Sequence, residues 1–84
     1  MRIPMQKTAY SRRQKVLTAL LRGARSEARL RQADVAARLG TPQSFVSKYE
    51  SGERRLDVPE LDQVCSALGI SLGELIRRYE EALR

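Results

Sequence analysis

The feature that most constrains this 84-residue chain is the segment from Leu30 to Gly52, which reads LRQADVAARLGTPQSFVSKYESG. Apolar residues recur at helical spacing on each side of Gly40, and each group forms one stripe. The stripes are Ala33, Val35, Ala36 and Leu39 before the glycine, and Phe45, Val46 and Tyr49 after it. Both stripes can be buried together only if a tight turn joins two short helices. The segment therefore predicts a helix-turn-helix.

The residues between the two helices suit such a turn. Gly40 follows the last apolar residue of the first helix, where a positive φ is needed and glycine adopts it without a Cβ clash. We expect Thr41 to cap the second helix and Pro42 to occupy its first position, which needs no N–H donor. We expect Ala36 where the helices approach most closely, because a larger side chain would push them apart.

Polar side chains fall on the outer face of the second helix, which we expect to run from about Pro42 to Ser51. The N-terminal part of such a helix enters the major groove of DNA. A glutamine at Gln43 can pair bidentately with N6 and N7 of adenine, and Lys48 can reach guanine or phosphate. We expect Phe45 in the core, with a thymine methyl contact as the alternative. The base-reading candidates are Gln43, Ser44, Ser47 and Lys48; the alternative is an ordinary solvated helix face.

The segments LRQADVAARLG and TPQSFVSKYESGERR resemble the phage-repressor and Cro class of helix-turn-helix regulators, the Xre family. The resemblance extends from about Arg22 to Leu75. It implies an all-α domain of five helices, in which the third helix reads the major groove and a dimer binds a palindromic operator.

The same resemblance implies roles for residues outside the reading face. Gln32 is expected to touch a phosphate and to steady Gln43, and the loop from Ser51 to Arg55 is expected to run along the DNA backbone. A buried ion pair between Arg25 and Glu50 is also implied.

The chain departs from the family pattern between the first two helices. Arg29 stands where a glycine commonly ends the first helix, and a left-handed conformation carries a steric penalty for arginine, so this connection is expected to be arranged differently. Arg31 stands where Ser or Thr usually caps the second helix, and it cannot accept an N–H bond. A weaker cap is expected there, with Arg31 adding a phosphate contact.

The net charge of +6 is distributed unevenly along the chain. Residues 1–31 carry nine Lys and Arg against one Glu, a balance of +8, whereas residues 32–56 carry +1 and residues 57–84 carry −3. Such an asymmetric field favours a polyanion on one side of the molecule. The alternative is a protein that is merely basic, because charge alone gives no specificity.

Residues 1–10 lack a helical period and are expected to form a flexible basic arm, whereas residues 11–84 are expected to form one domain. Its first helix begins at Ser11 and buries Val16, Leu17, Leu20, Leu21, Ala24 and Ala28. A fourth helix is expected from about Pro59 to Leu68, with Leu61, Val64, Cys65 and Leu68 buried. Ser71 and Glu74 have capping-box spacing before a last helix that reaches about Leu83.

Four arginines outside the helix-turn-helix are candidates for phosphate contact. Arg54 and Arg55 lie in the loop after the reading helix and can grip the DNA backbone. Arg12 and Arg13 open the first helix, where phosphate contact and a solvated face are equally compatible with the sequence.

Several classes of protein are disfavoured by composition. The chain has no histidine and one cysteine, so a zinc finger, a metal site and an internal disulfide are not expected, and Cys65 is expected to be an inert core thiol. No cofactor is expected. Without histidine, acid–base catalysis has no obvious base, and no apolar run suits a membrane span or signal peptide. We expect a cytoplasmic, nucleoid-associated protein and no enzyme.

The last helix carries a short apolar stripe of Ile76, Tyr79 and Leu83 that could pair with a second copy or only complete the core. A homodimer would place two reading helices one DNA turn apart. Together these features predict a sequence-specific double-stranded DNA-binding transcriptional regulator that acts as a repressor. The alternative is an antitoxin or other protein-interaction module, whose DNA binding is secondary to a partner.

Overall fold

The computed structural model describes residues 11–84, so the predicted basic arm at residues 1–10 lies outside the described residues. The described part contains helices and no strand, which confirms the all-α prediction. The five helices are α1 (Arg12–Glu27), α2 (Gln32–Leu39), α3 (Gln43–Ser51), α4 (Val58–Leu68) and α5 (Leu72–Ala82).

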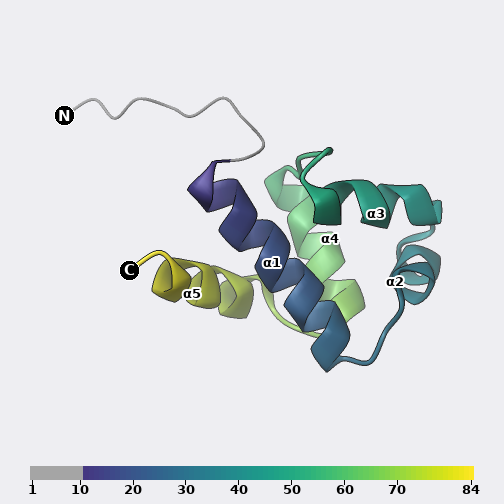
Figure 1. Ribbon diagram of the computed structural model, residues 1–84. Coiled ribbons are helices and arrows are strands. Elements are labelled where there is room, and N and C mark those ends of the chain that lie inside the picture. Colours follow the sequence, from purple (N-terminus) through teal and green to yellow (C-terminus); the bar gives the residue numbers. More distant parts are fainter. Residues whose placement is uncertain (1–10) are drawn as a thin grey trace.

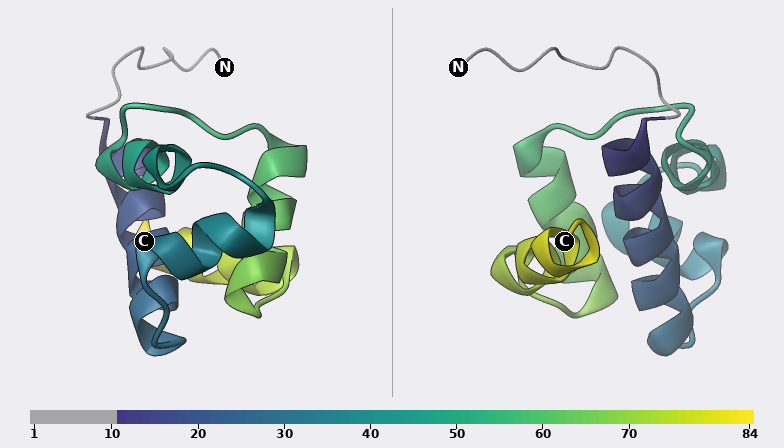
Figure 2. Two further views of the ribbon diagram at one scale, coloured as in Figure 1. Left: turned by 90° about the vertical axis from the view of Figure 1, so that its right-hand side faces the viewer. Right: turned by 60° about the vertical axis from the view of Figure 1, so that its left-hand side comes forward.

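The longest helix is α1, which runs through the middle of the view in Figure 1. Helix α2 packs against α3 and α4, while α1 packs against α3 and α5, and α4 completes the core against α5. The loop between α3 and α4 lies at the same end of the molecule as the N-terminal end of α1 (Figures 1 and 2). This arrangement leaves one side of α3 uncovered by any other helix.

The core is built from the apolar stripes of all five helices. Its fully buried side chains include Tyr49, Leu21, Leu75, Val35, Val46, Val64 and Cys65. Burial raises the pKa of the Cys65 thiol to about 11, as is expected for an inert thiol.

Two alanines predicted in the core are exposed, namely Ala28 and Ala33. Ala28 is the C-cap of α1, where the chain already leaves the helix. Ala33 lies two positions before Val35, about 160° around a helix with 3.6 residues per turn, and therefore faces away from the core. The buried stripe of α2 is narrower than the sequence suggests.

The predicted cap of α3 was also wrong. Pro42 is the N-cap, with an extended ψ of 153°, and Gln43 is the first helical residue. The Thr41 hydroxyl is buried without a hydrogen-bond partner, so it does not cap the helix. Gly40 does take the predicted left-handed conformation, with φ of 68°.

Helix α4 begins one residue earlier than predicted, because Asp57 and Glu60 form a complete capping box. The Asp57 carboxylate accepts a bond from the Glu60 N–H at 2.8 Å, and the Glu60 carboxylate accepts one from the Asp57 N–H at 3.1 Å. At α5 only half of the predicted box forms. Ser71 accepts from the Glu74 N–H, but the Glu74 carboxylate binds Arg77 and Arg78 instead.

The turn between α1 and α2 does not avoid the left-handed conformation. Arg29 adopts φ of 59° and is the one non-glycine residue with positive φ in the described part of the chain. The N–H groups of Arg29 and Leu30 bond to the carbonyls of Ser26 and Arg25, which is the Schellman pattern that usually takes glycine. The strain is on the order of 1–2 kcal/mol.

Candidate nucleic-acid interface

The four predicted base-reading residues share the uncovered face of α3. Gln43, Ser44, Ser47 and Lys48 are all exposed, whereas Val46 and Tyr49 on the opposite side are buried. Gln43 and Ser47, and likewise Ser44 and Lys48, are four residues apart and therefore neighbours on the helix surface. The face offers amide, hydroxyl and ammonium groups, which are the groups that hydrogen-bond to base edges.

A buried carboxylate lies behind this face. The Glu50 side chain is 1% exposed, and Arg25 of α1 donates to it twice, from Nε at 2.7 Å and from Nη2 at 3.1 Å. The ion pair implied by the family resemblance is thus present in the structure. Hydrogen bonding to Glu50 raises the pKa of Arg25, whose Nη1 also donates to the Leu30 carbonyl at 3.0 Å. One arginine therefore ties α1 to the end of α3 and to the α1–α2 turn.

A chain of hydrogen bonds runs from this ion pair to the exposed face. Gln32 donates from Nε2 to Glu50 at 3.0 Å, and Gln43 donates from Nε2 to Oε1 of Gln32 at 3.4 Å. A carboxylate only accepts, so Glu50 fixes which end of the Gln32 amide faces it. The remaining Gln32 oxygen then orients the Gln43 amide, whose own oxygen and second N–H are left for an outside partner.

At the start of α2, the side chain of the third helical residue bonds back to the N-cap residue. Arg31 is the N-cap, and the Asp34 carboxylate accepts from the Arg31 N–H at 2.8 Å and from its guanidinium at 2.9 and 3.1 Å. These guanidinium bonds lower the pKa of Asp34 to about 2. The Arg31 side chain remains 81% exposed. Sequence reasoning missed Asp34, although an acid three residues after an N-cap has capping-box spacing.

Arg54, a predicted phosphate contact, is held within the protein. It donates to both carboxylate oxygens of Glu60, at 3.1 and 2.7 Å, and to the Arg55 carbonyl at 2.9 Å. Its guanidinium also lies over the Phe45 ring, 4.7 Å from the centroid. Phe45 itself is half-buried against Tyr49, in the core position expected for it. Arg54 therefore connects the α3–α4 loop to α3 and to α4, a role that the sequence did not indicate.

We expect Arg54→Ala to destabilise the fold by about 1 kcal/mol, because it removes a partly exposed bidentate pair and a cation–π contact. The check is a double-mutant cycle with Glu60→Gln in urea unfolding. A coupling free energy of about 0.5 kcal/mol or more is expected. Strictly additive losses would show that the pair contributes nothing to stability.

The other predicted phosphate contacts lie at the start of α1 and in the α3–α4 loop. Arg13 and Arg55 are exposed, and Arg12 donates to the Leu83 carbonyl at the end of α5, at 3.3 Å.

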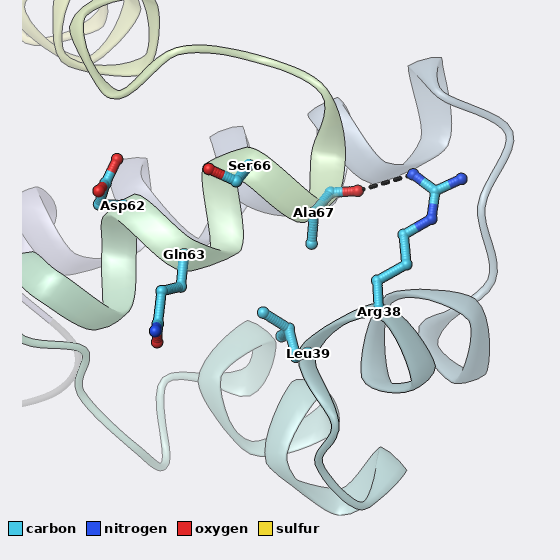
Figure 3. Close-up of a pocket in the computed structure, with 6 residues that line it drawn as sticks. All are labelled: Arg38, Leu39, Asp62, Gln63, Ser66 and Ala67. Atoms are coloured by element: carbon cyan, nitrogen blue, oxygen red, sulfur yellow. Dashed lines mark hydrogen bonds between the residues drawn. The ribbon is translucent and has the colours of Figure 1, made fainter.

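A shallow polar pocket lies between α2 and α4 (Figure 3). Arg38 donates to the Ala67 carbonyl at 2.8 Å, which ties the end of α2 to the end of α4. Asp62 is the one acid in the lining, and no base accompanies it, so the pocket holds no acid–base pair. Within residues 11–84 no cluster of acidic, Cys or His side chains could hold a metal ion, and no helix is long and apolar enough to cross a membrane.

Residues 16–79 match the family model of a helix-turn-helix domain. The solved structure of an XRE-family like protein from Pseudomonas syringae pv. tomato str. DC3000 is 46% identical, covers 86% of this chain and 88% of its own, and has a TM-score of 0.80. No curated protein matches the chain.

More distant structures share the fold. The wild-type restriction-modification controller protein C.Esp1396I is 18% identical over 87% of this chain and 94% of its own, with a TM-score of 0.80. The clp gene regulator ClgR from Corynebacterium glutamicum is 22% identical over 88% of this chain and 96% of its own, with a TM-score of 0.77. A tetramer of C.Esp1396I is also known in complex with its natural 35 base-pair operator, 20% identical over 88% of this chain and 99% of its own, with a TM-score of 0.79.

Proposed function

The chain belongs to the Xre family of helix-turn-helix proteins, and we propose that it represses transcription by binding a specific sequence of double-stranded DNA. Helix α3 reads the major groove through Gln43, Ser44, Ser47 and Lys48. A protein that reads chromosomal DNA works in the cytoplasm, at the nucleoid. The family and fold are those of regulatory DNA-binding proteins rather than of enzymes.

The observation that carries this proposal is the anchored amide of Gln43. An exposed glutamine on an ordinary solvated helix face has no need of a fixed orientation, yet this one is held through Gln32 by a buried ion pair. With its oxygen and one N–H left over, Gln43 can accept from N6 and donate to N7 of adenine. Holding the amide in place before binding lowers the entropy lost on contact.

Phosphate contacts position the protein on the duplex without reading its sequence. We assign them to six residues around the reading face: Gln32 and Arg31 at the start of α2, Arg54 and Arg55 after α3, and Arg12 and Arg13 at the start of α1. Arg54 keeps its Nε–H and one Nη2 proton after its bonds to Glu60 and the Arg55 carbonyl. It can therefore serve a phosphate without releasing Glu60.

We propose that the protein acts as a homodimer through α5. Ile76 is 38% exposed on this helix although it is a large apolar residue, and Tyr79 and Leu83 beside it are only half-buried. The oligomeric controller protein bound to its operator has a similar fold. A two-fold dimer would place two copies of α3 about 34 Å apart, which is one turn of DNA.

Selection of bound duplexes from a random library at near-physiological salt tests the function and the dimer together. We expect enrichment of an inverted repeat with half-sites one turn apart. Ile76→Asp, which puts a charge on the α5 stripe while leaving α3 untouched, should be a monomer and lose the paired half-sites. A folded wild-type protein that enriches no sequence would contradict the proposal and favour a module, such as an antitoxin, that depends on a protein partner.

A further inference from the structure

Arg29 adopts a strained left-handed conformation, which glycine adopts at the ends of α2, α3 and α4. Helices α2, α3 and α4 end at Gly40, Gly52 and Gly69, and each of these glycines has a positive φ between 68° and 83°. At the end of α1 the same left-handed turn is made by Arg29. Glycine would make this turn without strain. Strained residues gather at functional sites, so the side chain of Arg29 is a candidate for a function.

Within residues 11–84, the charge of Arg29 is unpaired. Its side chain is exposed and makes no hydrogen bond or ion pair with any residue in the described range 11–84. Its neighbour Arg31 is paired with Asp34, and Arg54 is paired with Glu60. Arg29, unlike these two arginines, has no carboxylate partner among the described residues.

Arg29 lies in the short turn that leads into α2. It precedes the N-cap of α2 by two residues and Gln32, whose side chain contacts Gln43, by three. Three residues of chain span at most about 11 Å, so the backbone of Arg29 lies within that distance of Gln32. Figure 2 shows the α1–α2 turn next to the start of α2, below α3 in the left view.

We propose that Arg29 binds a backbone phosphate of DNA, and that the left-handed turn is kept with arginine for this contact. The inference rests on the proposed function, because it assumes that α3 enters the major groove. It adds a contact at the α1–α2 turn, outside the reading helix and the loop that follows it.

Three substitutions separate strain from charge. Arg29→Gly removes both, Arg29→Gln keeps the strained backbone and removes the charge, and Arg29→Lys keeps both. We expect Arg29→Gly to raise the midpoint of thermal unfolding by about 4–8 °C, and the other two variants to leave it near the wild-type value.

Among these variants, DNA binding should change with the charge at position 29 and not with the stability of the fold. In titrations of a labelled random-sequence duplex at several KCl concentrations, we expect Arg29→Gly and Arg29→Gln to lower the slope of log K against log salt by about 0.9 per bound protomer. Arg29→Lys should keep the wild-type slope. Arg84→Gln is the control for net charge, since it removes one exposed positive charge that is not assigned to DNA and should leave the slope unchanged.

Unchanged slopes in both Arg29→Gly and Arg29→Gln, with a wild-type protein that binds DNA, would overturn the proposal and leave the proposed function intact. An equal loss in Arg84→Gln would also overturn it, because the effect would then be one of net charge. If the wild-type protein binds no duplex, the phosphate contact and the proposed function both fail.

Discussion

Arg25→Ala is expected to lower the free energy of unfolding by about 3–5 kcal/mol, the largest loss we predict for a single substitution. The Glu50 side chain is 1% exposed and receives two short bonds from Arg25. Removing the arginine leaves a buried negative charge with Gln32 as its nearest remaining donor. The Leu30 carbonyl, which accepts from Arg25 Nη1, loses a donor as well. Urea unfolding at neutral pH measures the effect.

Arg22→Ala is the matched control. Arg22 also lies near the Glu50 carboxylate, but at 3.8 Å and with 60% of its side chain exposed. Exposed pairs of this kind contribute about 0–1 kcal/mol. If Arg25→Ala loses no more than Arg22→Ala, the ion pair is not a main source of stability, and the orientation of Gln32 must then rest on other contacts.

The helix pattern could be predicted from sequence because burial imposes a period. Val35, Ala36, Val46 and Tyr49 are buried as expected, and Gly40 makes the expected turn. The errors lie where a helix begins or ends. Thr41 has the right chemistry for an N-cap, but the helix starts one residue after Pro42, so the threonine hydroxyl is one position too early. A side-chain pattern does not specify where the backbone changes conformation.

Arg29 shows a second limit of the sequence. A steric argument against a left-handed arginine is sound for the isolated turn. In the folded chain, however, Arg25 is bonded to both Glu50 and the Leu30 carbonyl, and these contacts hold the turn in its Schellman form. Tertiary contacts thus impose a local conformation that the residue itself disfavours.

The residues of the candidate site could be predicted from the sequence, but the contacts between them could not. Exposure of Gln43 and Lys48 follows from helical periodicity. The pairing of Arg54 with Glu60 depends on how the α3–α4 loop folds back onto α4, which no spacing in the sequence encodes. Positive charges that look equivalent in the sequence therefore differ in the structure in how readily they can serve a phosphate.

Gln43→Ala is expected to weaken binding to the selected operator by about 1–3 kcal/mol per half-site, which is roughly a 5- to 150-fold loss of affinity. Affinity for a random duplex should be unchanged, because phosphate contacts supply nonspecific binding. The alanine leaves Glu50, Gln32 and the Arg25 ion pair in place, so stability should hardly change. Titrations of both duplexes at one salt concentration give the specificity ratio directly.

The hydrogen bonds from Gln43 through Gln32 to Glu50 lead to a second expected result. Gln32→Leu removes the acceptor that orients the Gln43 amide, so it should lose part of the same specificity although Gln43 itself is retained. Gln63→Ala is the control, an exposed glutamine on α4 away from the reading face. Equal losses on operator and random DNA for Gln43→Ala would remove it from the base-reading residues, and the fixed amide would then serve only the packing of α2 against α3.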